Sequence, residues 1–260
     1  MGGVTGSWVP PPPRPDAQPL PPPPGGNGRV GGRTPTPAAT WKPVEAIPVF
    51  FIALVAGGLL ATAVGLLVTS RTFQFVAATA IVELAFGIAV LVWVRFVDKG
   101  PLAALGAPRR PLSDIGAGIA GGLGLTVVAG ISSVIVFSVA TAILGHRPAQ
   151  PKQIPDYVTS GAFIATGIVV ILAAPFGEEL LFRGFIYKGL RRRFSIWPAA
   201  LISACAFALL HVLPILILAI FPVGIGLALI YEWRQSLLAS MAAHATFNLI
   251  GFLTVALSRR

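Results

Sequence analysis

Long hydrophobic runs, broken only by short polar stretches, dominate the chain from about residue 44 onward. The first three runs cover Ile47–Val68, Phe75–Val97 and Ile115–Leu144. Each is long enough to cross the roughly 30 Å hydrocarbon core of a bilayer, which takes about 20 helical residues. The pattern therefore predicts that these runs are transmembrane helices.

A fourth run begins at Phe163 and continues through a charged stretch to Lys188, and three more follow it. The third run is rich in glycine, which permits close approach of helices inside a membrane bundle. We predict an all-α fold, a polytopic transmembrane bundle of about seven helices. The boundary at Leu213 and Pro214 is the least sharply marked. The last three runs are Trp197–Val212, Leu213–Ile230 and Leu237–Leu257.

Composition excludes several classes of protein. The chain is 55% hydrophobic and 11% charged, with a mean hydropathy of +0.83, which is too apolar for a water-soluble domain. The net charge of +10 does not indicate a nucleic-acid partner, because the basic residues fall at the edges of the apolar runs and face lipid headgroups. Cys205 is the single cysteine, so neither a disulfide framework nor a zinc site made of thiolates is expected.

Residues 1–42 differ in composition from the rest of the chain. They hold proline runs and Gly-Gly steps with few apolar side chains, which is typical of a disordered segment. No apolar core of a signal peptide follows Met1. We expect a disordered Pro/Gly-rich cytoplasmic tail over 1–42 and a transmembrane domain over 43–260.

The distribution of basic residues predicts the orientation. Short cytoplasmic loops carry the excess of Lys and Arg, and an N-terminus inside the cell satisfies this rule. The loop after the second helix then holds Arg109 and Arg110, and the loop after the fourth holds Arg191–Arg193. We expect a multi-pass integral protein of a prokaryotic plasma membrane, with its N-terminus in the cytoplasm.

Ionisable residues inside the apolar runs are the candidates for function, because each costs roughly 2.5 to 3.5 kcal/mol at the centre of an inserted helix. Glu179 and Arg183 are spaced i,i+4, so we expect a structural ion pair on one helical face. Glu178 projects about 100° away around the helix and has no such partner. Glu83, in the second run, has surroundings that specify no role, and we leave it outside the site.

Two histidines complete the candidate site. His211 lies four residues after Phe207, and His244 lies four residues before Asn248. If their helices converge with Glu178, the set suits hydrolysis of a peptide bond by an activated water. Glu178 would be the general base and His211 would orient the water, while His244 and Asn248 would donate hydrogen bonds to the oxyanion.

These motifs, Glu178-Glu179-x-x-x-Arg183, Phe207-x-x-x-His211 and His244-x-x-x-Asn248, resemble in order and spacing the CAAX prenyl protease and bacteriocin self-immunity family of intramembrane proteases. The resemblance covers about residues 100–257. It implies a protease-like core with a site that opens toward the cytoplasmic leaflet, and an endopeptidase acting on membrane-associated or lipidated proteins or peptides. Glu179, Arg183 and Phe207 would support the site structurally. The resemblance does not indicate whether the substrate is prenylated.

The resemblance leaves the cofactor open. A glutamate-type mechanism requires none, whereas members of the family are often described as metalloproteases. Glu178, His211 and His244 are the set that would hold a divalent metal such as zinc, in the three-ligand pattern of catalytic zinc. The sequence lacks His-Glu-x-x-His, the zinc-binding arrangement with the firmest precedent.

Two other classes of function compete with proteolysis. The first is a non-catalytic membrane scaffold or a bacteriocin-immunity protein of the same fold. The second is an ion-coupled transporter that uses Glu83, the glutamate pair and the histidines as a relay, but the halves of the chain show no repeat. The partners we expect are membrane lipids and a membrane-associated peptide or protein substrate. The sequence makes no prediction of the oligomeric state.

Overall fold

The fold is α-helical, as predicted. The structure is a computed structural model that describes residues 37–148, 161–211 and 213–258, and no β-strand occurs within these ranges. The predicted tail lies outside the described residues except for 37–42. In that short stretch Trp41 is fully buried, and its indole Nε1 donates a hydrogen bond to the Phe185 carbonyl at 2.8 Å.

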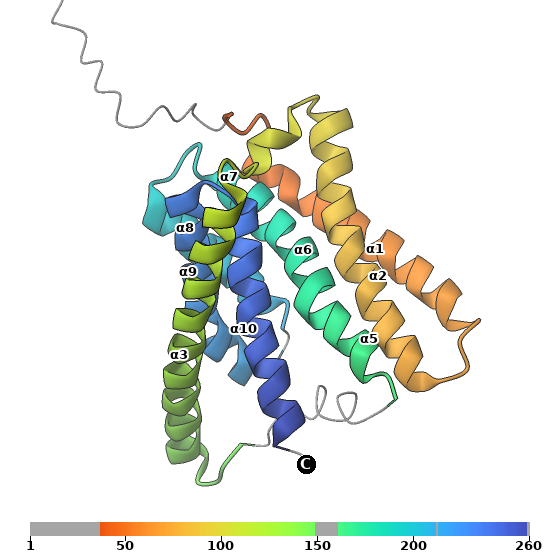
Figure 1. Cartoon of the computed structure of the whole chain (residues 1–260), viewed down its shortest axis with the longest axis vertical. Helices are drawn as coiled ribbons and strands as arrows, with labels where there is room; N and C mark the ends of the chain where they lie inside the picture. Colours follow the sequence, from red (N-terminus) through yellow and green to blue (C-terminus); the bar gives the residue numbers. More distant parts are fainter. Residues whose placement is uncertain (1–36, 149–160, 212, 259–260) are drawn as a thin grey trace, which may run out of the picture. The chain divides into compact units, whose positions relative to one another are not determined.

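Nine α-helices are described, and shorter helical segments of other pitch extend or connect them (Figure 1). The α-helices are α1 (Ala46–Gly65), α2 (Arg71–Val92), α3 (Pro111–Leu144), α5 (Phe163–Ile168), α6 (Ala174–Glu179), α7 (Lys188–Leu190), α8 (Ile196–Leu209), α9 (Pro214–Arg234) and α10 (Leu237–Leu257). The 3₁₀ turns are Pro43–Glu45 and Leu102–Leu105, and the π-helical segments are Trp93–Val97, Val169–Ala173 and Leu180–Tyr187.

Six helical stretches of the described chain are long and apolar enough to cross a membrane, which indicates a multi-pass integral membrane protein. One of them is the continuous helix Phe163–Leu190, in which α5, α6 and α7 are joined by π-helical turns. The seventh, α8, has 14 residues. At 1.5 Å per residue it is about 21 Å long, which is less than the hydrocarbon thickness. Pro214 starts the next helix, so the predicted boundary at Leu213 and Pro214 is present.

The helix Phe163–Leu190 lies between two groups of helices (Figure 1). On one side α1 packs along α2, and α2 crosses α6. On the other side α10 packs along α3 and also contacts α6, while α9 lies against α8 and α3. The segment with the two adjacent glutamates is therefore enclosed by helices that are distant in sequence.

Glycines let α3 and α10 approach closely, as the glycine content of the third run predicts. A Cβ atom at Gly118 would collide with backbone atoms of Ala239 and Ala243, and one at Gly122 with the Ala243 carbonyl. By contrast, a Cβ atom at Gly124 would meet no atom within 4 Å. Close packing of backbones is a main source of association between helices in lipid.

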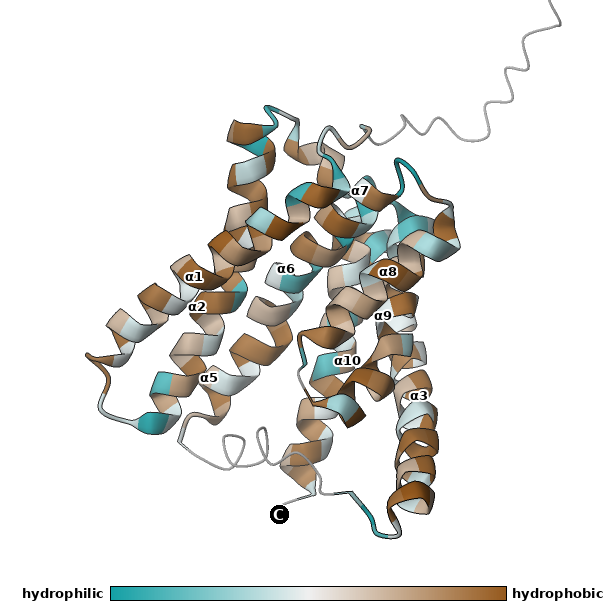
Figure 2. Ribbon diagram, turned by 180° about the vertical axis from the view of Figure 1, so that it is seen from behind, coloured by the Kyte–Doolittle hydropathy of each residue, from teal (hydrophilic) through white to brown (hydrophobic). Residues whose placement is uncertain are grey.

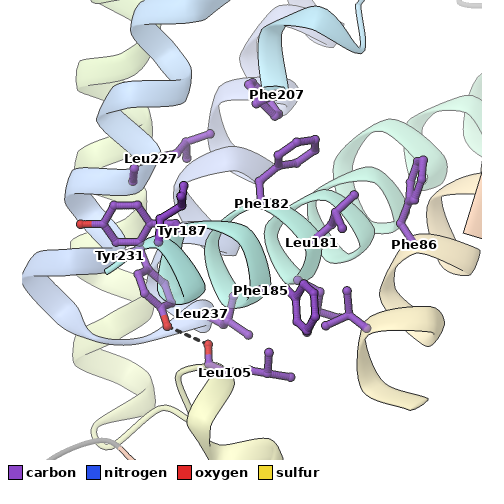
Figure 3. Close-up of a cluster of buried hydrophobic side chains, with 14 of the residues drawn as sticks. Phe86, Leu105, Leu181, Phe182, Phe185, Tyr187, Phe207, Leu227, Tyr231 and Leu237 are labelled. Carbon is purple, nitrogen blue, oxygen red and sulfur yellow. Dashed lines mark hydrogen bonds between the residues drawn. The ribbon is translucent and has the colours of Figure 1, made fainter. Parts of the chain in front are cut away.

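Hydrophobic residues predominate along the long helices, and hydrophilic ones gather mainly at the helix ends (Figure 2). The buried cluster contains many aromatic rings (Figure 3). Within it the Tyr231 hydroxyl donates a hydrogen bond to the Leu105 carbonyl at 2.9 Å, and the Tyr187 and Tyr231 rings meet edge to face. This packing holds the end of Phe163–Leu190 against α9.

Arg192 and Arg234 connect four chain segments at one end of the bundle. Arg192, after α7, donates a hydrogen bond to the Thr40 carbonyl before α1, at 2.9 Å. Arg234, at the end of α9, pairs with Asp114 at the start of α3, with 2.6 Å between Nη2 and Oδ1. Arg191, also after α7, pairs with Glu232 near the end of α9 at 3.0 Å, so the beginning of α1, the beginning of α3, the end of α7 and the end of α9 lie on the same side of the helices.

Candidate functional site

The helix that carries the two glutamates is irregular on both sides of them. The π-helical segments Val169–Ala173 and Leu180–Tyr187 flank α6. Pro175 has no N–H group, so the regular hydrogen bond to the Ile171 carbonyl cannot form, which favours a change of pitch at this point. Wider π turns recur at functional sites. The sequence analysis did not predict these segments, and Pro175 was a signal for the first of them only.

Glu179 and Arg183 form the ion pair that their spacing predicts. The distance from Arg183 Nη1 to Glu179 Oε1 is 2.8 Å, and both side chains are fully buried. Arg183 Nη2 also donates to the Gly224 carbonyl of α9 at 3.0 Å, and the guanidinium carbon lies 4.5 Å from the centre of the Phe207 ring. The pair therefore ties α6 to α8 and α9.

His244 of α10 lies between the two glutamates. Its Nδ1 is 2.9 Å from Glu179 Oε1, and its Nε2 is 3.6 Å from Glu178 Oε2. Since the Glu179 carboxylate accepts a hydrogen bond, Nδ1 carries a proton, and Nε2 faces Glu178. Glu178 and His244 are both buried, with 8% and 4% of their surfaces exposed.

Phe207 brings the two histidines together. The centre of its ring lies 5.3 Å from that of His211 and 5.8 Å from that of His244, and both pairs meet edge to face. Phe207 also packs against Phe182, as Figure 3 shows. His211 follows the short helix α8, and its Nδ1 lies 3.3 Å from the Phe207 carbonyl. Among the described residues it makes no direct hydrogen bond to either glutamate.

Asn248 lies one turn beyond His244 on α10 and faces a different neighbour. Its amide Nδ2 donates a hydrogen bond to the Val170 carbonyl at 2.8 Å. That carbonyl belongs to the first π-helical segment, whose altered pitch leaves it available. In this structure the amide thus joins α10 to the helix Phe163–Leu190, and its predicted hydrogen bond to an oxyanion stays a prediction.

The residues proposed for a metal do not gather as ligands. Within 37–148, 161–211 and 213–258, no three His, Cys, Asp or Glu side chains are placed so that they could hold one ion. Glu178 and His244 are neighbours, but His211 does not complete a three-ligand set with them. The arrangement described does not fit the zinc site that the sequence left open.

A comparison with known families supports the motifs. Residues 160–250 match the family model of the Rce1-like type II CAAX prenyl endopeptidases. The resemblance inferred from the motifs is therefore confirmed. The match covers less than half of the chain, from before α5 into α10, and every candidate site residue lies inside it. No curated protein and no solved structure matches the chain.

The structure adds one ionisable residue to the surroundings of the site. Glu83 of α2 lies at the crossing of α2 and α6, where its backbone contacts Gly177. Its carboxyl group is close enough to Glu178 for the two to interact electrostatically. This proximity could not be predicted from the sequence, because Glu83 lies far from the motifs along the chain and outside the region of the family match.

Proposed function

We propose that the protein is an intramembrane endopeptidase that hydrolyses a peptide bond in membrane-associated or lipidated proteins or peptides, with Glu178 as the general base. The observation that carries this proposal is the position of His244, held by Glu179 on one ring nitrogen and facing Glu178 with the other. This arrangement lies within a segment that matches an endopeptidase family.

Each residue has a distinct part in the mechanism. Glu179, which accepts hydrogen bonds from Arg183 and His244, fixes the orientation of the imidazole and keeps a proton on its Nδ1. Glu178 has no guanidinium partner, so its carboxylate is free to accept a proton from a water molecule. The water oxygen then attacks the scissile carbonyl carbon, and Glu178 passes the proton to the leaving amine.

The imidazoles of His211 and His244 assist the same reaction. His211, held against Phe207, orients the attacking water. His244 donates a hydrogen bond from Nε2–H to the carbonyl oxygen as negative charge develops there, an effect worth on the order of 3 kcal/mol per donor in other enzymes. Asn248 helps to stabilise the same negative charge if its amide leaves the Val170 carbonyl when substrate binds.

We further propose that the protein lies in a prokaryotic plasma membrane with its N-terminus in the cytoplasm. The basic residues after α7 and at the end of α9 lie at the end of the bundle where α1 begins. Short cytoplasmic loops carry such an excess of Lys and Arg. A site that opens toward this side would receive substrates from the cytoplasmic leaflet.

A non-catalytic scaffold or immunity protein is the second candidate. Two observations favour it: the Asn248 amide already has a partner within the bundle, and His211 makes no direct hydrogen bond to the glutamates among the described residues. A scaffold would use the buried polar residues only to join helices, and it would not need Glu178 as a base.

Cleavage of membrane-tethered reporter peptides by the full chain in nanodiscs distinguishes the two candidates. We expect Glu178→Gln to lower kcat by roughly 10²- to 10⁴-fold, the range typical of a lost general base. His211→Ala should also lower it. Glu45→Gln is the matched control, since Glu45 bonds Lys42 and Trp93 and has no contact with the site.

The comparison requires that all three variants have the same unfolding temperature as the native chain. Cleavage by the native chain and by Glu45→Gln, but not by Glu178→Gln, supports the protease. Equal cleavage by the native chain and Glu178→Gln, or no cleavage by the native chain of any peptide in a diverse library, would favour the scaffold. Repeating the assay with a chelator measures whether the activity depends on a metal.

A further inference from the structure

Glu83 occupies a constrained position against the helix that carries Glu178. A Cβ atom at Gly177 would collide with the backbone of Glu83, and one at Gly87, a turn further along α2, would collide with the Phe176 ring. The backbones of α2 and α6 are thus in contact at the residue next to Glu178. This packing gives Glu83 little freedom to move away from the site.

The Glu83 side chain is a partly buried acid, and one of its two carboxyl oxygens is buried without a partner in the part of the chain that the structure describes. Its Oε2 atom is shielded from solvent and has no hydrogen-bond partner among the described residues. It interacts electrostatically with Glu178. An ionised carboxylate that is buried without a partner costs several kcal/mol, so such a group is either neutral or close to a cation.

The described cations near the site are already engaged. Arg183 directs one guanidinium nitrogen to Glu179 and another to the Gly224 carbonyl. His244 directs Nδ1 to Glu179, and its Nε2 lies 3.6 Å from Glu178 Oε2. Glu178 and Glu179 therefore have positive groups beside them, and among the described residues Glu83 has none.

We propose that Glu83 is a positioning residue of the hydrolytic centre: a neutral carboxylic acid on α2 whose O–H is directed to the Glu178 carboxylate, while His244 approaches Glu178 from α10. The catalytic role that we give to Glu83 rests on the proposed function. It goes beyond the family resemblance, because Glu83 lies outside the matched residues 160–250. The hydrogen bond keeps the Glu178 carboxylate in one orientation toward the attacking water.

Infrared spectroscopy of the full chain in nanodiscs tests the neutral acid without any need for activity. The spectrum of the native protein minus that of Glu83→Gln, at neutral pH, should show the carbonyl band of a protonated carboxylic acid. Glu178→Gln should shift the frequency of this band, because it removes the carboxylate that accepts the hydrogen bond. Absence of the band, or a band unchanged by Glu178→Gln, overturns the proposal.

Kinetics test the positioning role. Glu83→Gln can still donate a hydrogen bond, so it should keep kcat within about threefold of native, whereas Glu83→Leu should lower kcat by roughly tenfold or more with little change in KM. Thr79→Val, one turn away on α2, is the matched control, since the Thr79 hydroxyl bonds only the Phe75 carbonyl of its own helix. The control should cleave like the native chain.

The outcomes separate the two proposals. A Glu83→Leu protein with native kcat, or a Glu83→Gln protein as slow as Glu83→Leu, overturns the role of Glu83 while leaving the protease intact. If Glu83→Leu does not fold, Glu83→Gln and the infrared bands still decide. If the native chain cleaves nothing, the proposed function fails, and the infrared bands alone confirm or overturn the hydrogen bond between Glu83 and Glu178.

Discussion

The helix Phe163–Leu190 and helix α3 are both long, apolar and glycine-containing, yet they bury very different amounts of their surfaces. Half of the most apolar stretch of Phe163–Leu190 is buried by other helices, whereas none of that stretch of α3 is. The first helix carries Glu178, Glu179 and Arg183, and α3 carries its one acid, Asp114, in its first turn.

The difference shows where charge is tolerated within this protein. In the interior of the bundle, Arg183 finds a carboxylate and a carbonyl as partners, and the desolvation cost of its charge is offset. On the surface of α3 an equal charge would face lipid without a partner. Matched substitutions on the two helices should therefore differ in their effect on stability.

The largest effect is expected from breaking the buried ion pair. Arg183→Met should lower the free energy of unfolding by roughly 3 to 5 kcal/mol, because it leaves the Glu179 carboxylate buried without its guanidinium. Chemical or thermal unfolding in nanodiscs measures the loss. The control on α3 is Leu123→Met, where 53% of the side chain is exposed, and it should unfold like the native protein.

A double variant sharpens this prediction. Glu179→Leu combined with Arg183→Met removes both charges and should recover much of the stability, since no isolated ion remains. It should not recover cleavage, because His244 then lacks the carboxylate that orients it. Native stability of Arg183→Met alone would contradict the buried pair.

The next effect concerns glycine on the same two helices. Gly177→Ala should cost roughly 1 to 3 kcal/mol, because its Cβ atom would push α6 away from the Glu83 backbone. Gly124→Ala on α3 meets no atom within 4 Å and should be neutral or stabilising by up to about 1 kcal/mol. The difference between the two unfolding midpoints is the measurement, and equal midpoints would contradict the close crossing of α2 and α6.

A smaller effect is expected where α10 joins the first π-helical segment. Asn248→Leu removes the hydrogen bond to the Val170 carbonyl and should lower the free energy of unfolding by about 0.6 kcal/mol, the mean for such bonds between helices in a membrane. Thr254→Val is the control, because its hydroxyl bonds only the Ile250 carbonyl of its own helix. A loss of cleavage far larger than the loss of stability would indicate that Asn248 also contacts the substrate.

The smallest effect depends on pH and lies just outside the membrane-spanning segments. Burial and the neighbouring Glu45 carboxyl raise the pKa of Asp98 to about 6. Because the folded state holds this proton more tightly than the unfolded state, the stabilisation is present at low pH and is lost as the pH rises through 6. Asp98→Asn should raise the unfolding temperature above this pH, and the gain should shrink below it. A gain that is independent of pH would contradict the raised pKa.

Much of the fold was predictable from the sequence because lipid imposes simple rules. The length of the runs predicted the helices, glycine content predicted that α3 could approach another helix closely, and the i,i+4 spacing predicted the pair of Glu179 and Arg183. The motifs predicted a family resemblance that the match over 160–250 confirms. These properties depend on residues near one another in the chain, where helix geometry alone relates them.

Only the tertiary structure determined which side chains of different helices meet. It alone placed His244 between Glu178 and Glu179, directed Asn248 to the Val170 carbonyl, and brought Glu83 against Gly177. Helical periodicity gives the face on which a side chain lies but not the neighbour that this face meets, because that neighbour depends on how distant helices cross. The sequence by itself determined an apolar helical bundle with a polar interior, and the crossing of α2, α6 and α10 determined which of those polar groups meet.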